Sequence, residues 1–227
     1  QFLMDLRRLP PPDAVRIEEL VNYFDYDYSG PTADSEAPFA AHIEVAGCPW
    51  TPEHRLVRIG VKGREIVSDK RPPSNLVFLV DVSGSMDEPN KLPLVKKAMR
   101  MLVNELDAKD RVSIVVYAGA AGTVLEPTPG SEKGKILAAI DDLTPGGSTA
   151  GAEGIRQAYQ LARSSFVKNG VNRVILATDG DFNVGITDPN QLEDFVTRER
   201  ESGVTLTCLG FGMGNYNDAL MQKLAQK

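Results

Sequence analysis

The chain has 227 residues with 25 Lys or Arg against 31 Asp or Glu, and this net charge of −6 without a basic cluster is untypical of proteins that bind nucleic acids or anionic membranes. Two cysteines, Cys48 and Cys208, are too few for a disulfide framework or a cysteine-based zinc site. The longest apolar runs, such as residues 76–80, are too short to cross a bilayer, so no transmembrane segment is predicted.

The N-terminal part of the chain predicts one helix and two strands. Residues 13–24 have the apolar spacing of an amphipathic helix and follow three consecutive prolines. Residues 39–45 and 55–61 predict two strands of an antiparallel pair. His42 alternates within the first strand and is expected to be half-buried, and Trp50, between two prolines, is expected to be a packing anchor.

A proline-rich segment near residue 70 separates this part from the rest of the chain. We therefore expect an N-terminal extension over residues 1–70 and a main domain over residues 71–227. The chain begins without Met and ends inside a helix-like segment, so we expect a fragment or mature form whose main domain is truncated at its C-terminus. No targeting signal is present in this sequence.

From residue 75 onward, strand-like and helix-like segments alternate. The predicted strands are residues 75–82, 111–117, 123–125, 173–178 and 204–211. The predicted helices are residues 91–106, 132–143, 152–166, a helix starting at 188, and 217–225. This alternation with short connections predicts an α/β fold with a doubly wound, mostly parallel, Rossmann-like sheet. Such a sheet binds ligands just beyond the carboxyl ends of its strands.

Oxygen-bearing side chains gather where predicted strands end. Asp81, Ser83 and Ser85 follow the first buried strand, Thr149 precedes a helix, and Asp179 follows a later buried strand. Carboxylates and hydroxyls without His or Cys suit a hard cation, Mg²⁺ before Ca²⁺ or Mn²⁺. Two carboxylates would balance the charge of one divalent ion. If neither bound it directly, the ion would stay electrophilic toward an outside carboxylate.

These segments resemble the metal-ion-dependent adhesion site (MIDAS) of the von Willebrand factor A (VWA) domain. Residues 81–85 fit its Asp-x-Ser-x-Ser motif, Thr149 its loop threonine and Asp179 its later aspartate, within a resemblance that covers residues 75–225. The resemblance implies the VWA fold. It also implies that the two serines and the threonine contact the metal, while the aspartates act directly or through water. One coordination position is left for a Glu or Asp of a ligand.

A narrower resemblance is to the bacterial YfbK-like branch of this family. It rests on residues 8–12, 17–24, 48–50, 116–122 and 179–185. Many members of that branch resemble exported lipoproteins. The resemblance therefore implies an extracytoplasmic location, either periplasmic or as a membrane-anchored lipoprotein.

The favoured function is a non-enzymatic, metal-dependent protein-binding module for adhesion or scaffolding. A cation at the predicted site would coordinate an acidic side chain of an unidentified partner protein. Met86, Gly147 and Asp181 are the residues expected to contact that partner. For Asp181, an outer coordination sphere role and a plain surface turn are equally compatible with the sequence.

Two other functions are less compatible with the sequence. A metal-dependent hydrolase or phosphotransferase of the haloacid dehalogenase type also places an Asp at the end of the first strand. That class needs a second Asp two residues later as the acid and base, and Ser83 stands there. An anion-channel component would need a membrane-spanning segment, which this sequence lacks, so the chain could be at most a soluble accessory domain of a channel.

Overall fold

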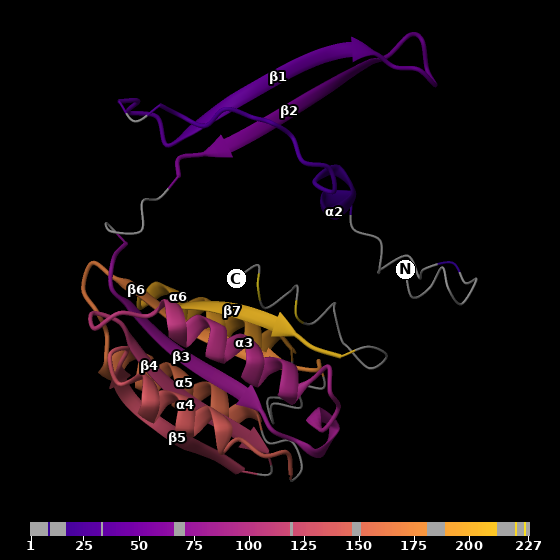
Figure 1. The fold of residues 1–227 in the computed structure, drawn as a ribbon. Helices are drawn as coiled ribbons and strands as arrows, with labels where there is room; N and C mark the ends of the chain where they lie inside the picture. Colours follow the sequence, from indigo (N-terminus) through magenta and orange to yellow (C-terminus); the bar gives the residue numbers. More distant parts are fainter. Residues whose placement is uncertain are drawn as a thin grey trace. The chain divides into compact units, whose positions relative to one another are not determined.

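The computed structural model contains two compact units, residues 1–71 and 72–227 (Figure 1). The residues whose structure is described are 9, 17–32, 34–65, 71–118, 120–146, 151–180, 189–212, 221 and 225. Within this part of the chain, no helix combines the length and the apolar character needed to span a membrane.

The first unit contains the antiparallel pair that the sequence predicts. Strands β1 (Phe39–Gly47) and β2 (Arg55–Gly63) pair over nine residues each, from Phe39 opposite Gly63 to Gly47 opposite Arg55. The described helix, α2 (Ile17–Val21), has only five residues and ends short of the predicted end at residue 24. The predicted start of this helix, at residue 13, lies outside the described residues.

The two faces of the β1–β2 ribbon differ in chemistry. On one face the ring of Tyr28 stacks on His42, with 4.9 Å between the ring centroids, and the guanidinium of Arg58 lies 5.7 Å from the centre of the Tyr28 ring. Gly60 makes this arrangement possible, because a Cβ atom there would lie 2.2 Å from the Tyr28 ring. His42 is half-buried, as predicted.

The opposite face, which we call the apolar ribbon face, carries six large apolar side chains that are between 53% and 66% exposed: Phe39, Ile43, Val45, Val57, Ile59 and Val61. The turn at the end of the ribbon also contradicts one prediction. Trp50 is 75% exposed and does not act as a packing anchor. Backbone hydrogen bonds within the turn, from Cys48 to His54 and from His54 to Thr51, close it without help from the indole.

The second unit is built on a five-stranded sheet in the order β5-β4-β3-β6-β7, which confirms the predicted α/β class. Its strands are β3 (Ser74–Asp81), β4 (Arg111–Ala118), β5 (Ala120–Pro129), β6 (Val171–Thr178) and β7 (Thr205–Gly210). Strand β3 pairs in parallel with β4 and β6, and β6 pairs in parallel with β7. The edge strand β5 is antiparallel to β4.

Strand β5 is ten residues long, whereas the sequence predicted three residues, 123–125. Pro127 and Pro129 interrupted the expected strand pattern, yet proline is compatible with an edge strand because one side of that strand needs no ladder hydrogen bonds. Since β4 ends at Ala118 and β5 begins at Ala120, there is no room for a crossover helix. The two strands therefore run antiparallel.

Helices cover both faces of this sheet (Figure 1). They are α3 (Leu92–Glu105), α4 (Lys133–Asp141), α5 (Gly151–Ser164) and α6 (Pro189–Glu201). Alternate residues of β3 belong to two separate cores: Phe78 and Val80 pack with residues of α3 and α4, while Val77 and Leu79 pack with residues of α5 and α6. The central strand is therefore apolar over residues 76–80, as expected for a doubly wound sheet, while its end residues Ser74, Asn75 and Asp81 are buried polar groups. Most of the helix predicted over residues 217–225 lies outside the described residues.

The thiol of Cys208, on β7, is partly buried and should react slowly with alkylating reagents. Burial raises the pKa of Cys208 to about 11. Its thiolate fraction at pH 8 should therefore be roughly 100-fold lower than that of an unperturbed thiol. We expect iodoacetamide to alkylate Cys208 far more slowly in the native protein than in urea, as followed by mass spectrometry of the modified peptides. Equal rates in the two states would contradict the described burial.

Candidate metal centre

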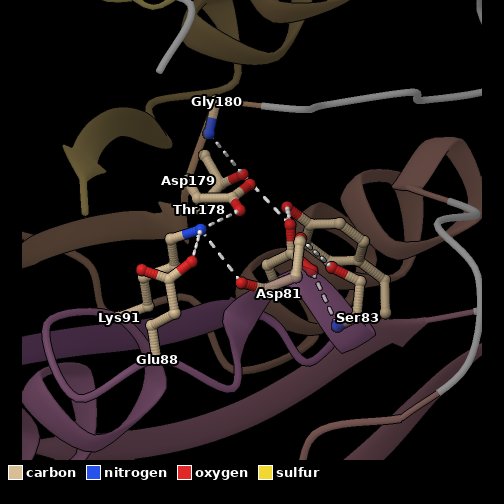
Figure 2. A network of polar contacts seen from close by, with 9 residues as sticks. Asp81, Ser83, Glu88, Lys91, Thr178, Asp179 and Gly180 are labelled. Carbon is tan, nitrogen blue, oxygen red and sulfur yellow. Dashed lines mark hydrogen bonds and ion pairs between the residues drawn. The ribbon is translucent and has the colours of Figure 1, made fainter. Parts of the chain in front are cut away.

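Two aspartates lie at the carboxyl ends of adjacent parallel strands. Asp81 is the last residue of β3, and Asp179 directly follows β6, which ends at Thr178. Because β3 and β6 are parallel neighbours, their carboxyl ends meet at the same edge of the sheet. Both aspartates have 0% exposure, and Figure 2 shows their side chains close together.

Asp81 accepts hydrogen bonds at both carboxylate oxygens. Oδ1 accepts the backbone N–H of Ser83 at 2.9 Å, and Oδ2 accepts the hydroxyls of Thr178 at 3.1 Å and Tyr117 at 3.2 Å. Burial raises the pKa of Asp81, and the negative charge of Asp179 adds to this effect, whereas the hydrogen bonds from Ser83 and Thr178 oppose it. The carboxylate is thus held in one orientation by three separate segments of the chain.

Tyr117 is a member of the site that sequence reasoning missed. It lies opposite Asp81 in the β3–β4 register, and its side chain is completely buried. Burial, together with the charge of Asp81, raises the pKa of Tyr117 well above its ordinary value. The phenol therefore stays protonated and donates to the carboxylate. Only the strand register brings the two residues together, which the local pattern around Tyr117 does not reveal.

The turn after β3 places the two predicted serine hydroxyls side by side. The short 3₁₀ helix η3 (Gly84–Met86) follows Ser83, and the Oγ atoms of Ser83 and Ser85 lie 3.0 Å apart. Ser83 is buried, whereas Ser85 is exposed. A hydroxyl pair that spans from the buried carboxylates to solvent is suited to hold an ion that outside ligands can reach.

Met86 was predicted to contact a partner, and the structure contradicts this. Its side chain has 0% exposure and packs in the core beneath α3 and α4. The tight turn of η3 directs residue 86 toward the interior, so a partner has no access to it. Thr149, Gly147 and Asp181 lie outside the described residues, and their roles stay predictions. The backbone N–H of Gly146 donates to the carbonyl of Val82 at 2.7 Å, which holds Gly146 beside the turn.

Lys91 is a second residue that the sequence analysis missed. It precedes α3 and is only 3% exposed. Its Nζ donates to the carbonyl oxygen of Ser85 at 3.0 Å. It also lies 3.2 Å from both Oδ2 of Asp179 and Oε1 of Glu88 (Figure 2). Burial works against the charged form, but the hydrogen bonds and charges of Asp179 and Glu88 outweigh it and raise the pKa of Lys91.

The residues at this edge fit a hard divalent cation. We refer to Asp81, Ser83, Ser85, Lys91 and Asp179 as the carboxyl-edge cluster. Its oxygens are carboxylates and hydroxyls, which Mg²⁺, Ca²⁺ and Mn²⁺ accept as ligands. Across the described parts of the chain, no three His, Cys, Asp or Glu side chains converge on a possible ion. A metal at this edge would therefore depend on the serine hydroxyls as well as on the carboxylates.

The fold and this cluster agree with a known protein class. Residues 75–227 match the von Willebrand factor type A domain, and the chain belongs to this family. Residues 1–58 match a second family, described as von Willebrand factor. The resemblance drawn from the motifs at residues 81–85 and 179 is thereby confirmed at the level of family and fold.

The chain is 47% identical over 222 residues to the uncharacterized protein YfbK of Escherichia coli (strain K12). That match covers 96% of the chain but 39% of YfbK, so the chain spans well under half the length of this relative. A von Willebrand factor type A structure from Catenulispora acidiphila aligns with a TM-score of 0.59 at 20% identity, covering 86% of this chain and 45% of that one. Proximal thread matrix protein 1 from the mussel byssus, with a zinc-occupied MIDAS motif, aligns with a TM-score of 0.56 at 27% identity, covering 70% and 40%.

Proposed function

We propose that the carboxyl-edge cluster, completed by Thr149, binds a divalent cation, Mg²⁺ in the first instance, and that the ion offers an open position to a Glu or Asp of a partner protein. The observation that carries this proposal is the pair of fully buried carboxylates, Asp81 and Asp179, beside a hydroxyl pair that reaches solvent. Lys91 supplies one positive charge beside these two carboxylates, so a bound cation would compensate the negative charge that is left, and hydroxyls supply neutral ligands without adding negative charge.

The hydrogen bonds of Asp81 support the open position. Since both of its oxygens already accept protein donors, Asp81 is suited to orient Ser83 and to act on the ion over a short distance or through water. Direct contacts then fall to the neutral hydroxyls of Ser83, Ser85 and Thr149. An ion held mainly by neutral ligands keeps a strong attraction for an outside carboxylate.

The proposed role is non-catalytic. A phosphotransferase of the haloacid dehalogenase type would use Asp81 as a nucleophile, but this carboxylate is completely buried and hydrogen-bonded at both oxygens. We propose Gly147 and Asp181 as partner-contacting residues around the ion. We also propose an extracytoplasmic location, either periplasmic or as a membrane-anchored lipoprotein, on the basis of the resemblance to the YfbK-like branch drawn from the sequence motifs.

Calorimetric titration with Mg²⁺, Ca²⁺ and Mn²⁺ tests this function, with acetate standing in for the partner carboxylate. We expect saturable binding that acetate tightens and that acetamide, its neutral analogue, does not. Ser85→Ala removes an exposed hydroxyl without disturbing the core and should weaken binding at least tenfold, a change of about 1.4 kcal/mol. Failure of all three ions to bind would refute the metal site. Binding that ignores acetate would refute the carboxylate partner.

A further inference from the structure

A lysine is built into the proposed metal centre. The Nζ of Lys91 is surrounded by the Ser85 carbonyl oxygen, the Asp179 carboxylate and the Glu88 carboxylate, at 3.0 to 3.2 Å. An ammonium group has three hydrogens, and these oxygens account for all of them. The group therefore occupies a complete cation-binding position between two segments that would also hold the metal.

Packing keeps the ammonium group in this position. Gly212, two residues after the end of β7, has a positive φ of 88°. A Cβ atom there would lie 2.6 Å from Cε of Lys91 and 3.2 Å from its Cγ. The aliphatic part of Lys91 thus fills the space left by a glycine. With 4% of its side chain exposed, it has no free route to solvent.

The charge of Lys91 changes the net charge that the buried groups present to a metal ion. Asp81 and Asp179 contribute −2, and Lys91 contributes +1, so the buried part of the cluster has a net charge of −1 when no ion is bound. Glu88 is 59% exposed, and water screens much of its charge. A divalent ion would bring the buried part to +1. One further carboxylate is then needed for neutrality, and the open coordination position is where it would enter.

We propose that Lys91 is a tethered cation that makes metal binding dependent on the partner's carboxylate. Without an ion, its ammonium group neutralises Asp179 and stabilises the cluster. With an ion, its positive charge weakens the protein's own hold, so that the acidic side chain of the partner completes the charge balance. This inference rests on the proposed function and adds a regulatory rule to it: ion and partner bind tightly together and weakly apart.

Lys91→Met tests the rule, with Lys97→Met as a control that removes an exposed charge from helix α3, which begins directly after Lys91. Metal-free Lys91→Met should melt roughly 5–10 °C below the wild type, because Asp179 loses its buried partner. It should nevertheless bind Mg²⁺ about tenfold more tightly in the absence of acetate, because a nearby positive charge is gone. Acetate should then tighten its Mg²⁺ binding much less than in the wild type. Lys97→Met should resemble the wild type in all three measurements.

Glu88→Gln provides a variant that does not disturb the core, since Glu88 is largely exposed. It leaves the Lys91 charge less compensated and should weaken Mg²⁺ binding while enlarging the acetate effect, opposite in sign to Lys91→Met. Lys91→Met with unchanged or weaker Mg²⁺ binding, or with an undiminished acetate effect, would overturn the proposed role of Lys91. A wild type that binds no ion refutes the proposed function itself, which is a distinguishable result.

Discussion

Asp81→Asn is expected to reduce Mg²⁺ affinity at least 100-fold while the protein keeps its fold. Asparagine matches aspartate in size, so the buried space beside Tyr117 and Thr178 stays filled. The substitution removes one of two buried negative charges that attract the ion, and a lost charge–charge interaction in a buried site costs about 3 kcal/mol. Calorimetric titration at neutral pH measures the affinity, and circular dichroism confirms the fold.

Asp81→Ala separates the charge of this residue from its hydrogen bonds. Alanine leaves the buried hydroxyls of Tyr117 and Thr178 without their carboxylate acceptor, and each unsatisfied buried group costs about 1–3 kcal/mol. Burial raises the pKa of Asp81 because it disfavours the ionised carboxylate. Removing this carboxylate therefore also removes a desolvation cost, which offsets part of the loss in stability. We expect a net fall of about 2 kcal/mol in the free energy of unfolding, measured in urea without metal.

Asp87→Asn is the control for both Asp81 variants. Asp87 is an exposed acid on the same turn and should leave Mg²⁺ affinity within a few-fold of the wild type. If Asp81→Asn bound Mg²⁺ as tightly as Asp87→Asn does, Asp81 would not belong to the metal site.

Gly154→Val is expected to lower the free energy of unfolding by about 2–3 kcal/mol. Helix α5 lies so close to the sheet that a Cβ atom at Gly154 would be 3.0 Å from Cβ of Tyr117 and 3.2 Å from Cδ1 of Leu79. Valine adds two methyl groups beyond that atom, and overpacking of a filled core costs about 1–3 kcal/mol or more. The better helix propensity of valine offsets only a few tenths of a kcal/mol.

Gly134→Val in α4 is the matched control, because a Cβ built there would have no atom within 4 Å apart from its chain neighbours and the backbone of its own helix. It should be neutral or slightly stabilising. Combining Gly154→Val with Leu79→Ala tests the mechanism further, since the shortened side chain at position 79 makes room for the new methyl groups. Strict additivity of the two single effects in urea unfolding would show that the contact with Leu79 is not the cause.

The sequence was sufficient for the class of fold because the strongest patterns are local. The apolar run before Asp81 reflects the burial of a single strand, and the helical spacing after Lys91 reflects the one buried face of a single helix. The structure confirms both elements as β3 and α3. The edge strand β5 was underestimated because prolines obscured its pattern. The prediction for Met86 was wrong because the position of a residue within a loop does not reveal the direction of its side chain.

The site was only partly predictable for a related reason. Asp81, Ser83 and Ser85 form a motif within five residues, so their proximity is local. Lys91 meets Asp179 across 88 residues of sequence, and Tyr117 meets Asp81 across 36. Both contacts depend on strand order and register, which composition and spacing do not encode. It stays a prediction that Thr149 binds the metal and that Gly147 and Asp181 contact the partner. The functional separation of residues 1–70 from the rest of the chain also stays a prediction.

The β1–β2 ribbon has an unequal tolerance to substitution along its length. Gly60 should resist every replacement, because any side chain there displaces the Tyr28 ring from His42. Its neighbours Ile59 and Val61 belong to the apolar ribbon face, and polar residues at these positions should leave the strand pairing intact. Among natural variants, substitutions are thus expected to accumulate at every second position of β2. Where variants keep Ile59 and Val61 apolar, selection must act on something other than the folding of the ribbon.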